Sequence, residues 1–379
     1  MMTDKEFIDI ANKIKPLLNE YARKSPYDMV SFHEITDIIG FYFFAQKKAD
    51  WAVLEVGCGG RYCSSNVIPH KDAAIITNIG WDHVELLGTS LKKIAYEKAG
   101  IITCRCPVFT MEKRKKLRAV FENEAMKYRA VLHYIQPAFT THGVTRAPQG
   151  ARPTTAATSS LARCGVARSL VTPLEILQSD ITGTAFIYQE KHFCLQTPGL
   201  HQVDNAILVI NAARALGLPE DAIKKGLSSA QQPLRMEVVS RSPLIILDGA
   251  HNVEKMTTTV ETVMKIYKFK NLKIGPLNRN VKPPKTNFQF SKFSNFHLIV
   301  GFSADKNIDR MIRELATLKP ATVVCTRNTI NPFRKVANPK TIAGLFQRYC
   351  PSAHTEIFID PHAALGWSMK QLKKDDILL

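Results

Sequence analysis

Apolar residues follow two alternating spacings along the chain, one typical of helices and one typical of buried strands. Helical spacing, with apolar side chains every three or four positions, marks residues 1–24, 33–47, 90–102 and 111–130. Short unbroken apolar runs lie between these stretches, at residues 51–57, 73–80 and 107–110. Such runs indicate strands buried on both faces. Their alternation with helices predicts an α/β fold with a parallel sheet.

The same alternation returns in the second half of the chain. Residues 181–199 alternate like a hairpin, and a helix is predicted over 201–217. From about Pro233 a second α/β unit begins, with predicted strands at 234–240 and 244–252 and a helix at 253–267. Further strands are indicated by the segments FHLIV, ATVVCT, TEIFID and the terminal DDILL. We therefore expect two α/β domains, residues 1–232 and 233–379, joined near residues 228–234.

Two stretches, residues 136–174 and 268–296, break the pattern. The first is rich in Pro, Thr, Ala and Arg, and both read as irregular insertions or long loops, which we expect to be poorly ordered and distant from any site. They contribute strongly to a formal net charge of +18 at pH 7. A basic chain can bind nucleic acid, but neither stretch has a helix-turn-helix or an interleaved aromatic pattern. Acidic small substrates explain the charge equally well, so nucleic-acid binding is kept only as an alternative reading.

Composition excludes several other classes of protein. The chain has 379 residues, 45% of them hydrophobic, which is enough for a sizeable core in each domain. No apolar run approaches the length of a membrane span, and the first residues lack the apolar core of a signal peptide. We therefore expect a cytoplasmic protein, and a monomer by default. The eight cysteines show no C-x-x-C spacing, which favours free thiols over zinc or disulfides.

Candidate chemistry gathers where predicted strands end, which is where open α/β sheets bind ligands. Glu55 precedes a glycine turn, and Asp82 and His83 follow the next strand. A strand-end carboxylate suits a hydrated magnesium ion, although a capped glycine turn is the plain alternative. In the second unit, the segment LDGAHN contains Asp248 and His251, where a simple Asp-Gly turn is again possible.

The ordered set of motifs resembles one family. LEVGCGGR, TNIGWDHVELLG, IAYEKAGII, HQVDNA, PLRMEVV, ILDGAHN and GFSADKN occur in an order similar to that of the folylpolyglutamate synthase/dihydrofolate synthase branch of the Mur ligases. The resemblance implies a Mur-type nucleotide-binding domain, here truncated, followed by a smaller Rossmann-like domain with the site between them. It also implies ATP-dependent addition of L-glutamate to a folate through an acyl phosphate. The alternatives are another Mur-type amino-acid ligase and a non-catalytic remnant.

The resemblance also assigns roles to individual residues. Magnesium would be held by Glu55, His83 and a carbamylated Lys98, with His83 and Lys98 as the catalytic residues. The residues expected to contact ATP are Asn205, Arg235, Asp248 and His251. The residues expected beside the folate pterin are Tyr62, Cys63 and Ser64, where Cys63 replaces an aspartate of the usual pattern.

Two features depart from the family. Its phosphate loop, of the G-T-x-G-K-G-[ST] type, would precede the region matching Met1, and no G-x-x-x-x-G-K-[ST] motif occurs in this sequence. The family also continues past the residue matching Leu379. From these departures we expect the chain to be a fragment, and to be inactive as a ligase on its own because the phosphate-binding amides and lysine are missing.

Overall fold

The computed structural model describes residues 2–27, 29–81, 83–136, 174–268, 295–329 and 335–379, and the backbone of three short strands between residues 139 and 167. These residues form two compact units, which are described separately. One unit runs to Gln136 and includes residues 166–167, and the other includes everything from Leu174 onward. The predicted domain boundary after residue 232 stays a prediction.

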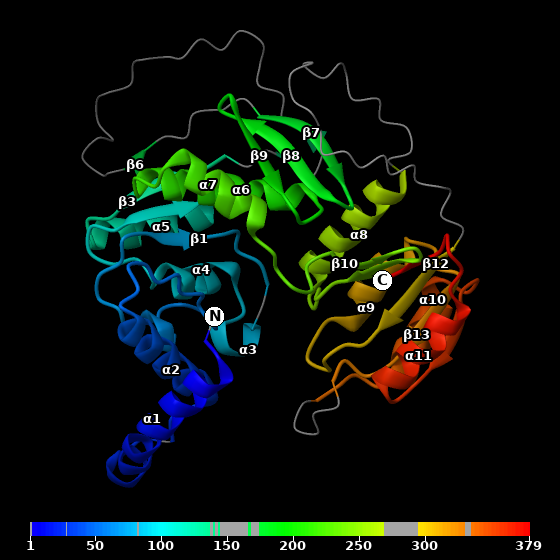
Figure 1. Cartoon of the computed structure of the whole chain (residues 1–379), viewed down its shortest axis with the longest axis horizontal. Helices are drawn as coiled ribbons and strands as arrows, with labels where there is room; N and C mark the ends of the chain where they lie inside the picture. Colours follow the sequence, from blue (N-terminus) through cyan, green and yellow to red (C-terminus); the bar gives the residue numbers. More distant parts are fainter. Residues whose placement is uncertain are drawn as a thin grey trace. The chain divides into compact units, whose positions relative to one another are not determined.

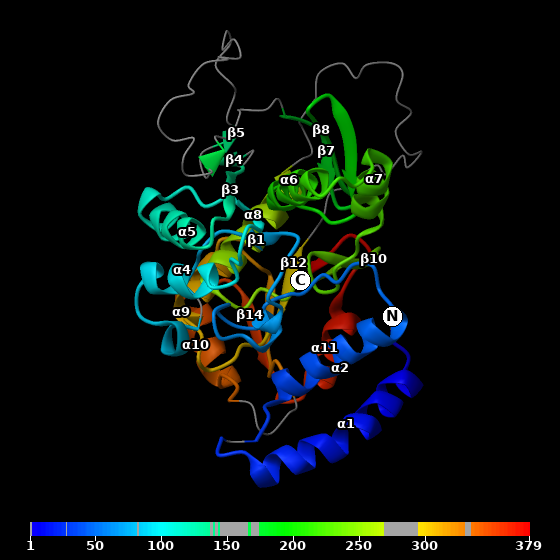
Figure 2. The same cartoon turned by 90° about the vertical axis from the view of Figure 1, so that its left-hand side faces the viewer.

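The first unit begins with a pair of helices, α1 (Asp4–Lys24) and α2 (Phe32–Lys47), as the sequence pattern predicts. Each helix starts with a capping box in which a hydroxyl residue and a glutamate satisfy each other's backbone amides. The two helices lie side by side (Figure 2) and pack through Ile10, Ile14 and Ile39. Many other apolar side chains of this pair remain exposed.

A parallel sheet follows, with the strand order β1 (Ala74–Ile76), β2 (Pro107–Thr110), β3 (Val131–Tyr134) and β6 (Val166–Ala167). Two helices, α4 (Leu91–Ala99) and α5 (Lys115–Lys127), pack on it through a core that includes Ile94, Phe121 and Leu132. The predicted parallel α/β arrangement is confirmed for β1, β2 and both helices, and β3 is a further strand that was not predicted.

The predicted buried strand at residues 51–57 is wrong. This stretch has no strand conformation, and Trp51, Val53 and Leu54 are exposed, Val53 to 93%. A run of apolar residues becomes a buried strand only where a neighbouring strand completes its hydrogen bonds and a second layer covers it. Among the described residues β1 pairs with β2 alone, so residues 51–57 have no ladder to join.

The second unit opens with an antiparallel sheet of β7 (Leu174–Asp180), β8 (Gly183–Tyr188) and β9 (Lys191–Leu195). The predicted hairpin is therefore confirmed, and β7 adds a third strand. Helices α6 (Leu200–Ala215) and α7 (Glu220–Ser229) follow, of which only α6 was predicted. Phe186 and Phe193 stack in the core with their ring centres 5.5 Å apart.

A six-stranded sheet forms the rest of this unit (Figure 1), with the order β10-β11-β15-β12-β13-β14. Its strands are β10 (Glu237–Arg241), β11 (Leu244–Leu247), β12 (Phe296–Val300), β13 (Thr322–Cys325), β14 (His354–Ile357) and β15 (Ile377–Leu378). Only β10 runs antiparallel to its neighbour. The accompanying helices are α8 (Val253–Lys268), α9 (Ile308–Ala316), α10 (Pro339–Tyr349) and α11 (Pro361–Gln371). The predicted second α/β unit is confirmed.

Most of the two predicted insertions lies outside the described residues. Within the first, the structure gives the backbone of β4 (Phe139–Thr140), β5 (Gly143–Val144) and β6, which is an edge strand. The second insertion is bounded by the end of α8 and the start of β12. Among the described helices, none combines the length and the apolar character needed to cross a bilayer.

Candidate functional site

In the first unit the glycine turn lies tightly against two helices. Gly59 and Gly60 have φ angles of +68° and +153°, which suit residues without a side chain. A Cβ on Gly60 would lie 2.9 Å from the carbonyl oxygen of Glu97 and 3.2 Å from the Cα of Lys98. A Cβ on Gly59 would lie 2.8 Å from Leu87. Because Gly60 lies this close to backbone atoms, its position requires glycine. The turn therefore contacts both the helix that carries Lys98 and the side chain of Leu87.

Arg61 fixes the turn to α4. Its backbone N–H donates to the Glu97 carbonyl at 2.8 Å, and its Nη2 donates to the Tyr96 carbonyl at 3.1 Å. The guanidinium also lies 3.9 Å from the centre of the Tyr96 ring and pairs with the buried carboxylate of Glu124 at 2.9 Å. A Cβ on Gly100 would meet the Arg61 Cβ at 2.3 Å, so this helix end is shaped to receive Arg61.

The predicted metal ligands belong to the elements that meet at this turn. Glu55 is exposed just before the turn, and Lys98 is half-buried on α4. His83 is exposed and left-handed, with φ +46°, and directly precedes α3 (Val84–Leu87). Their elements therefore converge, but the prediction that the three side chains themselves form a metal site is not tested by any measured distance.

A ready-made cluster of metal ligands is not present in the part of the chain that the structure describes. No group of three or more His, Cys, Asp and Glu side chains with suitable geometry occurs there. Asp82, next to His83 in the sequence, lies outside the described residues. A site of Glu55, His83 and a modified Lys98 would have only two such side chains, which suits a magnesium ion that keeps several waters.

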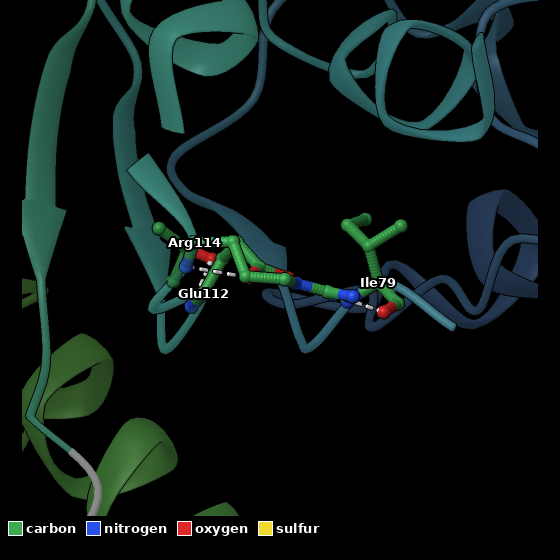
Figure 3. A network of polar contacts seen from close by, with 4 residues as sticks. Ile79, Glu112 and Arg114 are labelled. Carbon is green, nitrogen blue, oxygen red and sulfur yellow. Dashed lines mark hydrogen bonds and ion pairs between the residues drawn. The ribbon is translucent and has the colours of Figure 1, made fainter. Parts of the chain in front are cut away.

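A pair of charged side chains holds the segment that follows β1, four residues before His83 in the sequence (Figure 3). Glu112 accepts a hydrogen bond from the backbone N–H of Ile79 at 3.0 Å, and Arg114 donates to the Ile79 carbonyl. Glu112 is 4% exposed and follows β2 by two residues. Burial alone would raise its pKa, but the hydrogen bonds from Arg114 and Ile79 outweigh that effect and lower it. This pair was not predicted from the sequence. The pattern that pointed to Glu55, a carboxylate at the end of a predicted strand, also occurs at Glu112.

The three residues predicted beside the pterin differ in their surroundings. Tyr62 is 86% exposed. The hydroxyl of Ser64 donates to Asp37 on α2. The Sγ of Cys63 accepts from the Gly57 amide at 3.3 Å and lies 3.2 Å from the Ser65 hydroxyl. Burial would raise the pKa of the Cys63 thiol, but hydrogen bonds from Ser65 and from backbone amides lower it.

In the second unit Asp248 gathers three segments at the end of β11. Its Oδ2 accepts from the Met236 amide at 2.9 Å. Its Oδ1 accepts from the Ala250 amide at 2.9 Å and from the Thr259 hydroxyl of α8 at 2.8 Å. This carboxylate therefore already organises the protein around it, whatever further contact it makes with a nucleotide.

Arg235 and His251 are placed by this junction. Arg235 lies between two left-handed residues, Leu234 and Met236, with φ angles of +57° and +49°. The Leu234 carbonyl accepts from the Gly249 amide at 2.7 Å, which fixes the arginine turn against the end of β11. The Nδ1 of His251 lies 2.8 Å from the Gly249 carbonyl, and its Nε2 lies 3.1 Å from the Lys255 ammonium. His251 is therefore held between the Gly249 carbonyl and the Lys255 side chain.

Asn205 lies on the exposed face of α6, where its amide donates to Gln202 at 3.2 Å. One helical turn earlier, His201 is mostly buried. Burial lowers its pKa to about 4, with opposing influences from the nearby charges of Asp248 and Arg235. The charges of the Asp248 junction therefore act on His201, which was not predicted from the sequence to have a role of its own.

Comparison with characterised proteins identifies relatives in one group. The chain is 28% identical over 329 residues to the dihydrofolate synthase/folylpolyglutamate synthase of Bacillus subtilis, covering 84% of this chain and 64% of that protein. It is 30% identical over 261 residues to the corresponding Mycobacterium tuberculosis protein, covering 66% of this chain and 48% of that protein. The chain thus spans less than two thirds of either relative. No protein-family model matches it.

Solved structures give the same group. Thermotoga maritima folylpolyglutamate synthase superposes with a TM-score of 0.70 at 23% identity, over 99% of this chain and 73% of that one. The M. tuberculosis enzyme complexed with ADP and AMPPCP gives 0.73 at 20% identity, over 98% and 75%. The predicted resemblance to the folylpolyglutamate synthase/dihydrofolate synthase family is confirmed. The structural likeness also confirms the predicted α/β fold class.

Proposed function

We propose that the chain carries the magnesium- and nucleotide-binding residues of an ATP-dependent ligase that joins L-glutamate to tetrahydrofolate or to dihydropteroate, with little turnover expected from the chain alone. The observation that carries this proposal is a pair of sites whose residues match the family motifs. The first is the glycine turn docked on α4 beside Lys98, and the second is the Asp248 junction that places Arg235. Ligand sites at the carboxyl ends of parallel strands are typical of this fold class.

The first site supplies the residues that would hold magnesium. Glu55 and His83 offer a carboxylate oxygen and a ring nitrogen, and a carbamate on Lys98 would add a second anionic oxygen. Bound magnesium would neutralise charge on phosphate oxygens. Lys98 is half-buried on α4, where the backbone of the helix lies close to Gly60 of the glycine turn.

The second site supplies the residues that would bind the nucleotide. The guanidinium of Arg235 suits phosphate oxygens, and the exposed amide of Asn205 can hydrogen-bond the base or the sugar. Asp248 positions Arg235 by accepting from the amide that follows it, and His251 is held nearby by the Gly249 carbonyl and the Lys255 side chain.

The proposed reaction has two steps. A folate carboxylate oxygen attacks the γ-phosphorus of ATP, and ADP leaves, which gives an acyl phosphate. The glutamate amine then attacks the acyl carbon and loses a proton, and inorganic phosphate leaves. Both steps depend on holding the reactants in line and on neutralising charge, so the residues of the chain act by positioning and electrostatics. We also propose a cytoplasmic monomer, with ATP, glutamate and a folate as its small-molecule partners.

A second candidate is a chain that binds nucleotide or folate without turnover. One observation favours it, namely that the sequence contains no G-x-x-x-x-G-K-[ST] motif to cradle the β- and γ-phosphates. Loss of a single preorganised donor typically costs about 10²–10³ in rate, and such a loop provides several. The test must therefore separate binding from catalysis.

Binding is measured first, by calorimetric titration of the full chain with AMPPCP and magnesium. We expect saturable binding that Arg235→Gln weakens at least tenfold. The matched control is Arg348→Gln, which removes the same charge from the exposed face of α10. Equal affinity in all three proteins, or no binding at millimolar AMPPCP, would overturn the assigned nucleotide site.

Turnover is measured second, as phosphate release from ATP with and without glutamate and a reduced folate. Release that needs both substrates supports the ligase. AMPPCP binding without any such release supports the non-catalytic alternative.

A further inference from the structure

Glu112 and Arg114 recognise both main-chain polar groups of a single residue, Ile79. The carboxylate of Glu112 accepts from the Ile79 N–H at 3.0 Å, while the guanidinium of Arg114 donates to the Ile79 carbonyl. Figure 3 shows the two side chains reaching from the end of β2 toward the segment that follows β1. They therefore occupy the place that a neighbouring strand's backbone would take in a sheet ladder.

The pair is rigid in itself. Arg114 donates through Nε to Glu112 Oε1 at 2.7 Å and through Nη2 to Oε2 at 2.7 Å, which is a bidentate pairing. The Arg114 backbone amide donates to the same carboxylate at 2.9 Å, and the Glu112 amide donates to the buried Thr110 hydroxyl at 3.2 Å. The Glu112 side chain is 2% exposed, so water competes little for these bonds.

The clamped segment leads directly to His83, four residues after Ile79. The Ile79 side chain is 2% exposed in the core of the first unit, which fixes its depth. Core packing alone leaves the peptide planes on either side of Ile79 free to tilt, whereas bonds to both its N–H and its carbonyl fix them. A side chain that is to hold a ligand needs its supporting backbone fixed to within about 0.5 Å.

We propose that Glu112 and Arg114 are positioning residues for His83, which hold the strand end so that the histidine ring is presented to the metal. This inference rests on the proposed function, because it takes His83 as a magnesium ligand. Supporting groups of this kind typically alter metal affinity by about 10–100-fold when they are removed.

The test measures Mn²⁺ binding by electron paramagnetic resonance, on the full chain with AMPPCP present. The variants are His83→Ala, Glu112→Gln and Arg114→Lys, the last of which keeps the charge but cannot form the bidentate pair. The matched control is Arg214→Lys, which breaks another bidentate pair, with Glu220, at 2.6 and 3.0 Å. Hydrogen exchange of the peptide containing residues 77–83 gives a second readout that does not need metal.

We expect His83→Ala, Glu112→Gln and Arg114→Lys each to weaken Mn²⁺ binding about tenfold or more. The two clamp variants should also speed exchange in residues 77–83, and Arg214→Lys should change neither quantity. Because Arg114 is half-exposed, its conservative variant should stay folded even if Glu112→Gln does not.

Two results would overturn the inference, and they are distinguishable. If His83→Ala weakens Mn²⁺ binding but Arg114→Lys does not, the clamp has no positioning role and the proposed metal site stands. If His83→Ala leaves Mn²⁺ binding unchanged, the metal role of His83 fails, and the positioning role fails with it.

Discussion

The Cys63 thiol occupies a nest of hydrogen-bond donors at the start of the 3₁₀ turn Ser64–Val67. The amides of Gly57, Cys58 and Ser65 and the Ser65 hydroxyl all favour the thiolate, and together they outweigh the cost of burial. The family resemblance places an aspartate at this position, so the turn has the donors that an anion needs. A thiolate can meet the same donors.

We predict that iodoacetamide alkylates Cys63 with a midpoint below the ordinary thiol pKa of 9.0. Because the thiolate is the nucleophile, the rate should rise with pH and level off earlier than for an unperturbed thiol. Ser65→Ala removes one donor, so it should move the midpoint upward and slow the reaction at pH 7 several-fold. Peptide mass spectrometry of the alkylated chain measures both. A midpoint that Ser65→Ala does not move would contradict this account.

His201 makes a prediction about stability and pH. Its pKa falls from 6.5 to about 4 on folding, because burial disfavours the charged ring. Between these pH values His201 binds a proton in the unfolded chain but not in the folded chain. Its contribution to the free energy of unfolding is therefore present above pH 6.5 and is lost as the pH falls toward 4. Allowing for partial exposure, the loss attributable to this residue is about 2 kcal/mol.

His201→Gln cannot titrate and should remove that loss. Urea unfolding of both proteins at pH 7.0, 5.5 and 4.5 gives the difference between their unfolding free energies. Asp248, Arg235 and Lys265 are the charged groups that influence His201, and all of them are retained in the variant. A difference that stays constant from pH 7.0 to 4.5 would show that His201 has the same pKa in the folded and the unfolded chain, and would contradict this account.

At the scale of single residues, the predicted contacts with ATP stay predictions, and the structure adds what these side chains do within the chain. Asp248 was expected to contact ATP, and the structure shows its carboxylate binding two backbone amides and a hydroxyl of the chain itself. Glu112 and Arg114 were not predicted, because their role depends on Ile79, which lies 33 positions before Glu112. A spacing of that kind is set by strand pairing and has no local signature.

Secondary-structure elements were predicted well where local pattern and tertiary packing agree. The terminal DDILL, only five residues long, was recognised as a strand, and β15 pairs with both β11 and β12. WAVLEVG had an equally strong apolar pattern and is not a strand. The difference between them is the availability of neighbours, which is a property of the sheet and cannot be read from seven residues.

The end of α4 shows how one glycine can hold two elements together. Because a Cβ on Gly100 would lie 2.3 Å from the Arg61 Cβ and 2.4 Å from its Cα, Gly100→Ala must push the glycine turn away from the helix. Overpacking of this kind typically costs about 1–3 kcal/mol. We therefore expect a lower unfolding free energy and a weaker Arg61–Glu124 ion pair.

The matched control for Gly100→Ala is Gly226→Ala within α7. A Cβ there would have no neighbour within 4 Å, so alanine should stabilise the helix by about 0.5–1 kcal/mol. Chemical denaturation monitored by circular dichroism compares the two variants with the parent chain. Stabilisation by both substitutions would contradict the described contact between Arg61 and α4.

For the whole molecule, the sequence predicted two α/β parts, each with a sheet whose strands alternate with helices along the chain. It placed residues 181–199 in the first predicted domain, 1–232, whereas the described residues group β7, β8 and β9 with the C-terminal unit; the boundary after residue 232 stays a prediction. Ile181, at the turn between β7 and β8, packs with the core of the six-stranded sheet. That contact joins residues far apart in sequence, so hydrophobic periodicity alone does not contain it.

The net charge of +18 bears on what the molecule binds as a whole. A protein that binds DNA through distributed charge releases counterions, so its affinity falls by about 10³-fold or more between 50 and 200 mM salt when six or more phosphates are contacted. The binding of a nucleotide by a few directed groups, such as Arg235 at the Asp248 junction, depends much less on salt.

We predict that the dissociation constant of AMPPCP with magnesium changes less than about fivefold between 50 and 200 mM salt. Any affinity for a random DNA duplex should collapse over the same range, and the duplex should not displace AMPPCP at 200 mM salt. Fluorescence competition at four salt concentrations measures both affinities. AMPPCP binding that follows the steep DNA dependence, or is displaced by the duplex at high salt, would favour the nucleic-acid reading over the ligase.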